Sequence, residues 1–192
     1  MTAQSDGEPC PPESNIAAFE RYAVDLVELY GADAILITCS TMNRSAHRVR
    51  KAMEPYSVPV VQIDEAMMER AVRLGGKTLV IATHGPTVKN TQALLNETAQ
   101  GLRLPIDFTG ATVEEAFDLL GKGDIEGHNS VIADAIREVY SRESIDSVVL
   151  AQLSMSVFLL TYPDPEKEFG VPVLTSGVEG FRKVRSLWVD GE

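Results

Sequence analysis

The chain contains the same sequence pattern twice, at a constant spacing of 113 residues. Residues 31–63 begin GADAILITCSTM and end VPVVQI, and residues 144–176 begin SIDSVVLAQLSM and end VPVLTS. Identical residues recur at that spacing, namely Asp33 and Asp146, Met42 and Met155, and Pro59 and Pro172. An ungapped repeat of this length predicts two lobes of similar fold. It also places Cys39 and Gln152 at equivalent positions.

The chain alternates short apolar runs with longer amphipathic segments. The apolar runs are typical of strands buried on both faces of a parallel sheet, and they cover residues 34–38, 58–63, 77–83, 104–110, 147–152 and 171–175. Helical segments of about 10–15 residues between such strands indicate βαβ units with right-handed crossovers. We therefore predict an α/β fold of two pseudo-symmetric lobes, each a short parallel sheet flanked by helices.

Glycine and proline positions suggest how the chain is divided. The polar, Pro-containing start is expected to be a disordered lead-in, and Gly75-Gly76 is a clear break between the lobes. Asp64 is expected to cap the helix that precedes this break. The predicted units are a lead-in at 1–14, a first lobe at 15–75, a second lobe at 76–176, and a C-terminal helix at 177–192 that packs back on the first lobe.

The second copy of the repeat is preceded by a segment that the first copy lacks. A strand, helix and strand at residues 77–109 precede the second copy, and their counterparts in the first copy would lie before Met1. The first lobe is therefore expected to be incomplete, either as a shortened form or because the chain is truncated. A shortened parallel sheet exposes an apolar strand edge, which a homodimer would cover.

The charge of the chain argues against several kinds of partner. The formal net charge is −11, and Lys and Arg form no basic run. Nucleic-acid binding needs basic groups that neutralise phosphates, so no nucleic-acid partner is expected, nor an anionic membrane surface. No apolar stretch approaches the ~20 residues of a membrane span. A small carboxylate held by local dipoles remains compatible with this charge.

Cysteine and histidine usage indicates the compartment and the cofactor requirement. The two cysteines, Cys10 and Cys39, cannot form a disulfide framework, which favours a reducing cytoplasm. The start of the chain lacks the charged and apolar regions of a signal peptide. The three histidines have no metal-ligand spacing, and no glycine-rich nucleotide motif is present. We predict no metal and no cofactor.

Cys39 and Gln152 follow equivalent strands and are the leading candidates for chemistry. In open α/β sheets ligands bind beyond the carboxyl ends of the strands. Cys39 lies at such an end, before a predicted helix whose N-terminus favours a thiolate. The alternative is that Cys39 only fills the core, as most free cysteines do. Gln152 cannot act as a base, but its amide could orient a carboxylate or an enolate, or it could be a satisfied buried amide.

Hydroxyl groups lie beside both candidates and in a third loop. Ser40, Thr41 and Ser154 follow the two strand ends, where they could bind a carboxylate at a helix N-terminus or cap the helix. The loop Thr83-His84-Gly85-Pro86-Thr87 follows another strand, and Thr83 and Thr87 offer hydroxyl groups there. His84 could titrate near neutral pH, although a single loop histidine is usually only solvated.

Four segments, in order, resemble the aspartate/glutamate/hydantoin racemase superfamily. ADAILITCSTM is similar to its first cysteine segment, VIATHGPTVKNT to its threonine loop, VVLAQLSM to its second cysteine segment and VPVLTS to its last strand. The resemblance extends from about residue 15 onward. It implies two pseudo-symmetric lobes around a cleft, and cofactor-independent proton transfer at a carbon next to a carboxylate. Cys39 would be one base, and Thr41, Thr83 and Thr87 would bind substrate.

The chain departs from this pattern at three places. Gln152 stands where racemases commonly have the second cysteine, Leu153-Ser154 lacks the Thr-His of glutamate racemases, and the opening strand is missing. The chain is in this sense a single-cysteine, N-terminally shortened variant. Arylmalonate decarboxylases also use one cysteine, although it belongs to the other half.

These departures favour one-sided chemistry over racemisation by two thiols. We expect a racemase/isomerase-like enzyme that acts on a small carboxylic acid with Cys39 as acid and base. The alternatives are a non-catalytic protein that binds a small carboxylate, and an inactive truncated homologue.

Overall fold

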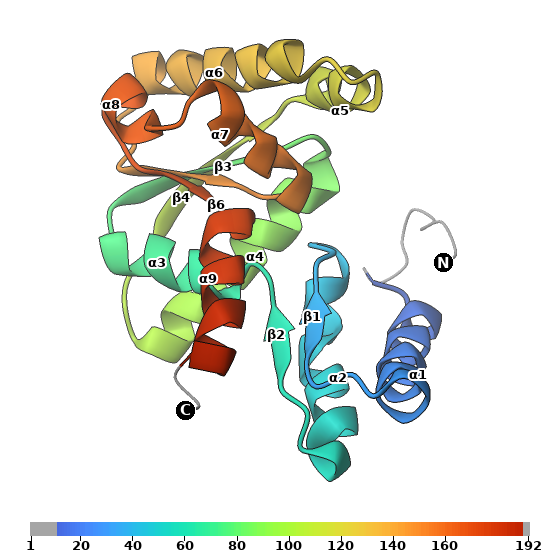
Figure 1. Ribbon diagram of the computed structural model, residues 1–192. Helices are drawn as coiled ribbons and strands as arrows, with labels where there is room; N and C mark the ends of the chain where they lie inside the picture. Colours follow the sequence, from blue (N-terminus) through green and yellow to red (C-terminus); the bar gives the residue numbers. More distant parts are fainter. Residues whose placement is uncertain (1–10, 190–192) are drawn as a thin grey trace.

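The computed structural model describes residues 11–189, which form a larger and a smaller α/β lobe (Figure 1). The smaller lobe consists of α1 (Glu13–Tyr30), which precedes the first sequence copy, and the elements of that copy. These are β1 (Ile35–Ile37), the 3-10 helix η1 (Met42–Ser45), α2 (Ala46–Met53), the 3-10 helix η2 (Glu54–Tyr56) and β2 (Val60–Gln62). The next helix, α3 (Glu65–Leu74), connects the two lobes.

The larger lobe contains the remaining elements. These are β3 (Lys77–Ala82), α4 (Gly85–Leu102), β4 (Asp107–Thr112), α5 (Glu114–Gly121), α6 (Ile125–Arg142), β5 (Ser147–Leu150), η3 (Leu153–Val157), α7 (Phe158–Thr161), α8 (Pro165–Phe169), β6 (Val173–Thr175) and α9 (Ser176–Val189). Each described strand overlaps an apolar run expected from the sequence. No helix within residues 11–189 is both long and apolar enough to cross a bilayer.

Both sheets are parallel, as the apolar runs predicted. The larger sheet has the strand order β4-β3-β5-β6, and the smaller sheet pairs β1 with β2. The strands of the repeat pair with the same register in the two sheets. Ile35 lies opposite Val60 in the smaller sheet, and Val148 lies opposite Val173 in the larger one. Because each position in the second pair is 113 residues beyond its counterpart in the first, the repeat is a repeat of structure.

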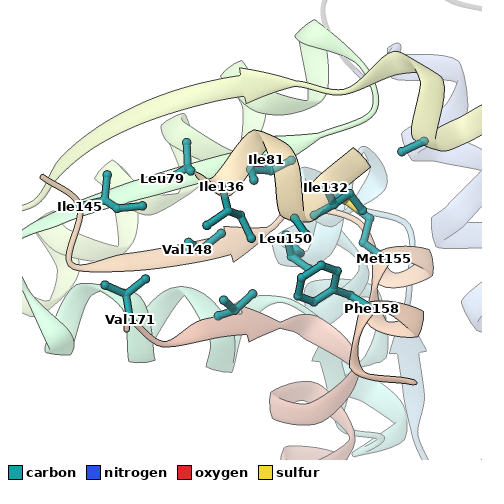
Figure 2. Close-up of a cluster of buried hydrophobic side chains, with 13 residues drawn as sticks. Leu79, Ile81, Ile132, Ile136, Ile145, Val148, Leu150, Met155, Phe158 and Val171 are labelled. Carbon is teal, nitrogen blue, oxygen red and sulfur yellow. The ribbon is translucent and has the colours of Figure 1, made fainter. Parts of the chain in front are cut away.

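Helices cover both faces of the larger sheet. Figure 1 shows α5 to α8 on one side and α3 and α4 on the other. The first face buries Leu79, Ile81 and Leu150 against Ile132 of α6 and Phe158 of α7 (Figure 2). Neighbouring residues in each strand point the opposite way, as the period of two in a strand requires.

The second face of the larger sheet is covered by α3 and α4. Val80 and Val149 pack against Met68 of α3 and Leu95 of α4. The buried side chains of α3 therefore belong to the core of the larger lobe, although α3 precedes the Gly75-Gly76 break. The domain limits at 75/76 and 176/177 stay a prediction. α1 begins at Glu13, inside the stretch expected as a lead-in, whose residues 1–10 lie outside the described part of the chain.

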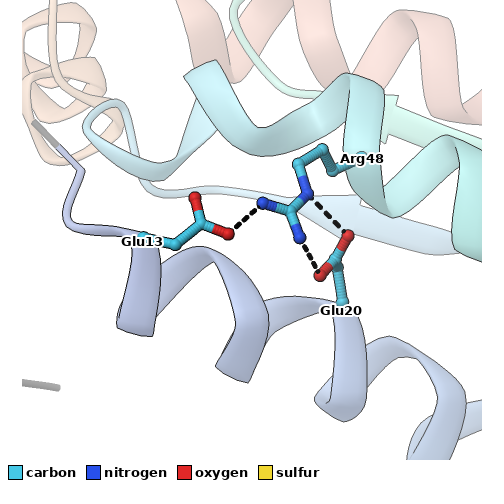
Figure 3. A network of polar contacts seen from close by, with 3 residues as sticks. All are labelled: Glu13, Glu20 and Arg48. Carbon is cyan, nitrogen blue, oxygen red and sulfur yellow. Dashed lines mark hydrogen bonds and ion pairs between the residues drawn. The ribbon is translucent and has the colours of Figure 1, made fainter.

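The smaller lobe has its own core between α1, α2 and β1. Ala23 of α1 packs with Ile35 and Ile37 of β1, and Val49 of α2 completes the contact. Arg48 of α2 joins the two helices by ion pairs to Glu13 and Glu20 of α1 (Figure 3). Its bonds from Nε and Nη2 to the two Glu20 carboxylate oxygens are both 2.8 Å long, a bidentate geometry that fixes α1 on α2.

The C-terminal helix α9 lies in close contact with β2 of the smaller lobe. A Cβ atom built on Gly180 would lie 2.2 Å from the backbone oxygen of Ile63, the residue after β2. Glu179 of α9, which is almost fully buried, pairs with Arg70 of α3 and with Arg182. Helix α9 therefore joins α3 and the end of the smaller sheet.

We expect Gly180→Ala to destabilise the protein by about 1–3 kcal/mol, because the added methyl group overlaps a backbone atom that cannot move alone. Urea unfolding followed by circular dichroism would measure this. The matched control is Gly101→Ala in α4, where an added Cβ meets no atom within 4 Å. That change should be neutral or stabilising by up to about 1 kcal/mol, since Ala favours a helix over Gly. Equal effects of the two changes would contradict the contact.

Candidate functional site

The carboxyl ends of the strands carry the residues singled out from the sequence. Cys39, Ser40 and Thr41 follow β1, Thr83 follows β3, and Gln152 follows β5. Because β3 and β5 are neighbours in the larger sheet, Thr83 and Gln152 meet there. This edge is where parallel α/β sheets bind ligands.

Gln152 is held by a hydrogen bond from the neighbouring strand end. The backbone N–H of Thr83 donates to Oε1 of Gln152 over 2.7 Å. This bond fixes the orientation of the amide, because only the oxygen of the amide can accept. The Nε2 group of Gln152 makes no hydrogen bond to the described residues and can donate to a ligand. An amide in this orientation can donate a hydrogen bond to an oxygen atom, and it cannot act as a base.

Two buried hydroxyl groups flank Gln152 without partners of their own. Thr83 is 2% exposed and Ser176, directly after β6, is 1% exposed. Neither side-chain oxygen has a hydrogen-bond partner among the described residues. Buried polar groups are rarely left unpaired, so these two are available to a ligand or a water molecule. Ser176 was not predicted as a site residue, although it follows the last strand just as Thr83 follows β3.

The other predicted residues of the larger lobe lie nearer to solvent. His84 is exposed, and its ring packs against Phe117 of α5 with the ring centres 5.1 Å apart. Its carbonyl accepts from the backbone N–H of Thr87, which closes the first turn of α4. Thr87 is half-buried there, and Ser154 is exposed in η3. In the described part of the chain, none of these side chains is hydrogen-bonded to Gln152 or to Cys39.

Cys39 lies in an apolar groove of the smaller lobe. The groove is formed by α1 residues such as Phe19 and Tyr22, by the β1 stretch from Ile35 to Cys39, and by Val49 of α2; no residue of the larger lobe lines it. The half-buried Cys39 contributes its backbone oxygen to a bond from the N–H of Asn43, which begins η1. An approach of its thiol to Gln152 stays a prediction.

Ser40 and Thr41 continue the chain from Cys39 into η1. Both are half-buried. Thr41 stands at the N-terminus of η1 and makes no side-chain capping bond. Its hydroxyl is therefore not used by the helix, which leaves the predicted role in substrate binding open.

A buried carboxyl group at the end of β2 was not expected. Asp64 is 3% exposed, and its burial raises its pKa above the usual value. A 2.7 Å hydrogen bond from Nε2 of Gln62 opposes this rise, as does the amide of Asn43, which lies beside Asp64 without a well-formed hydrogen bond. The predicted capping role of Asp64 is wrong, because its side chain makes no bond to the first turn of α3.

Within residues 11–189, no three His, Cys, Asp or Glu side chains are grouped so that they could hold a metal ion. The polar groups at the strand ends are hydroxyls, amides and one buried carboxyl. Such a set can donate and accept hydrogen bonds to an organic acid.

A family model described as Asp/Glu/Hydantoin racemase matches residues 7–184. The chain belongs to this family. The match covers both copies of the repeat and the threonine loop between them, so family membership agrees with the resemblance found in the sequence.

Solved structures of family-like proteins share the fold. Glutamate racemase isoform RacE1 from Bacillus anthracis is 19% identical over 97% of this chain and 70% of its own, with a TM-score of 0.65. Unliganded arylmalonate decarboxylase is 17% identical over 90% and 75%, with a TM-score of 0.59. Maleate isomerase from Pseudomonas putida S16 is 14% identical over 89% and 71%, with a TM-score of 0.56. The chain thus spans 70–75% of the length of these relatives, and a search of curated proteins finds no match.

We expect Asp64→Asn to change the pH dependence of stability. A carboxyl group whose folded pKa is raised binds its proton more tightly in the folded state. Its contribution to the free energy of unfolding is therefore full below its unfolded pKa of about 3.9 and is lost as pH rises through the raised value. Asparagine resembles the neutral form, so the variant should lack this loss and gain stability over the wild type as pH increases from about 4.

Urea unfolding at a series of pH values would measure the difference between the two proteins. Asp118→Asn is the control, because Asp118 lies exposed on α5 and its side chain makes no hydrogen bond or ion pair to the described residues. A stability difference for Asp64→Asn that does not vary with pH would show that Asp64 is not buried as described.

Proposed function

We propose that this protein is a cofactor-independent enzyme of the racemase and isomerase type. It acts at the carbon next to the carboxylate of a small organic acid, with Cys39 as the acid and base. The observation that carries the proposal is a family-matched chain in which a single described thiol stands at the carboxyl end of a strand. The relatives described above are named as a racemase, a decarboxylase and an isomerase.

A single thiol supports proton transfer on one face of the substrate. The Cys39 thiolate removes the proton from the carbon next to the carboxylate, and the electron pair of the C–H bond moves into an enolate. The thiol then returns a proton to the same carbon and is a thiolate again. Because solvent exchanges with the thiol, the product carries a solvent proton but keeps its configuration.

The enolate needs hydrogen-bond donors that are in place before the reaction. Nε2 of Gln152 and the hydroxyl groups of Thr83 and Ser176 supply such donors at three neighbouring strand ends. The hydroxyl groups of Ser40, Thr41 and Thr87 and the exposed Ser154 and His84 extend the set around the carboxylate. Decarboxylation fits the same arrangement, since loss of CO2 leaves the same kind of carbanion for the thiol to protonate.

A second candidate function is carboxylate binding without catalysis. The groove beside Cys39 is lined by apolar residues of the smaller lobe, and the amide of Gln152 is already bonded to Thr83. Under this alternative the donors of the larger lobe bind the acid, and Cys39 takes no part. An inactive shortened homologue would bind nothing.

Deuterium exchange separates these possibilities. The pure protein is incubated in D2O with the two enantiomers of aspartate and of glutamate, with hydantoins and with arylmalonates. We expect loss of the proton NMR signal next to the carboxylate, or release of CO2 from the malonate. Cys39→Ala should lower the rate by about 10²–10⁴-fold, the usual worth of a positioned acid and base.

Cys10→Ser is the control, because it removes the other thiol. Exchange that survives in Cys39→Ala would remove Cys39 from the mechanism. Calorimetric binding of an acid without any exchange would identify the second candidate function instead.

Gln152→Cys tests whether the two strand ends act on one substrate. If they face each other, a thiol at 152 provides the second face with its own acid and base. We expect the wild-type protein to exchange with retained configuration and Gln152→Cys to produce the other enantiomer, as followed by chiral chromatography. Gln152→Ser is the control, since it removes the amide without adding a base. Equal racemisation by both variants would contradict the opposed arrangement.

A further inference from the structure

Strand β1 has a free edge. It pairs with β2 on one side, and no other described strand pairs with it. The residues that pair toward β2 are Ile35, whose N–H donates to Pro59, and Ile37, whose oxygen accepts from Ile63. The backbone groups of Leu36 therefore point to the free edge, because alternate residues of a strand pair in opposite directions. The N–H of Thr38 has no backbone partner in the described part of the chain.

The repeat shows what covers the same edge in the larger lobe. The equivalent of β1 is β5, which pairs with β6 on one side and with β3 on the other. The residue equivalent to Thr38 is Ala151, and its N–H donates to Ile81 of β3 over 2.9 Å. The side chains of Leu79 and Ile81 in β3 point toward α6 and fill the space between that helix and the sheet.

The surface of α1 that faces the free edge is exposed. Tyr22 is 52% exposed and Leu26 is 44% exposed, and both line the apolar groove beside β1. Their equivalents on α6 are Ala135 and Val139, which pack against the core of the larger lobe. Among residues 11–189, no strand occupies the position equivalent to β3, and this leaves α1 uncovered.

We propose that β1 of a second copy of this chain occupies this edge. The two β1 strands pair antiparallel about a twofold axis perpendicular to the sheet. The result is one continuous sheet in the order β2-β1-β1-β2, with the four strands that the larger sheet also has. Self-pairing of this kind gives a closed dimer, because the same patch is used on both copies.

The side chains of β1 suit this place. Strand β1 turns Ile35 and Ile37 toward α1, as β3 turns Leu79 and Ile81 toward α6. The twofold axis keeps both α1 helices on the same face of the joined sheet, so Ile35 and Ile37 of each copy lie under the exposed Tyr22 and Leu26 of the other. None of the ten residues that line the groove is charged, so two chains of net charge −11 meet without like charges at the contact.

The dimer also changes the surroundings of Cys39. Cys39 lies at the end of the groove, so the second copy closes the open side of the groove beside the thiol. The interface is independent of the proposed reaction, and it would exist in a protein that only binds an acid.

Sedimentation equilibrium of the full chain tests the interface. We expect a monomer–dimer equilibrium, and stronger association at higher salt, which screens the net charge of the two chains. Leu26→Glu should weaken association at least about tenfold, because it buries two charges in the contact. Leu74→Glu is the matched control, since Leu74 is 46% exposed but lies on α3, away from the groove. Circular dichroism confirms that both variants are folded.

A cross-link tests the strand pairing directly. Leu36→Cys is made together with Cys10→Ser and Cys39→Ser. In the antiparallel pair, Leu36 of one copy lies opposite Leu36 of the other at about 5.5 Å between Cα atoms, within the range of a disulfide. We expect a disulfide-linked dimer under mild oxidation, and none from Leu74→Cys in the same background.

Three results would overturn the proposal. One is a protein that stays monomeric up to about 100 μM, a hundred times a Kd of about 1 μM. Another is a dimer that survives Leu26→Glu but not Leu74→Glu. The third is a Leu36→Cys protein that forms dimers in solution without cross-linking.

Discussion

A parallel sheet needs helices over its faces and protection of its unpaired strand edges, and a strand with a neighbour on each side and helices over both faces satisfies both needs. Strands β3 and β5 meet this requirement, because each has a neighbour on both sides and helices above and below. Strand β1 meets only half of it. The differences between the lobes follow from this point, including the exposed face of α1 and the apolar groove that reaches Cys39.

The strands and their parallel pairing could be predicted because each strand is a short apolar run and the same pattern of runs occurs twice in the chain. Apolar runs identify the strands, and the constant spacing of the repeat carries the pairing of Val148 with Val173 over to Ile35 and Val60. Parallel topology then places the residues after each strand at one edge. Cys39, Thr83 and Gln152 could be named as candidates for this reason alone.

Contacts between side chains could not be predicted in the same way. The hydrogen bond from Thr83 to Gln152 forms because β3 and β5 are neighbours in the sheet. The sequence of neither strand indicates that neighbour. Asp64 has the position of a helix cap, yet burial and the adjacent amide of Gln62 turn its carboxyl away from the helix. The packing of α3 on the larger sheet could not be predicted either, because the apolar face of the helix does not indicate which of the two sheets it covers.

The close approach of Gly180 to the backbone of Ile63 limits how the two lobes can move. A helix that touches a backbone atom without an intervening side chain has no room to slide inward. The seam between α9 and β2 therefore cannot close further. A closer approach of α9 to β2 would have to displace the backbone of Ile63, so movement at this seam can only separate the two elements.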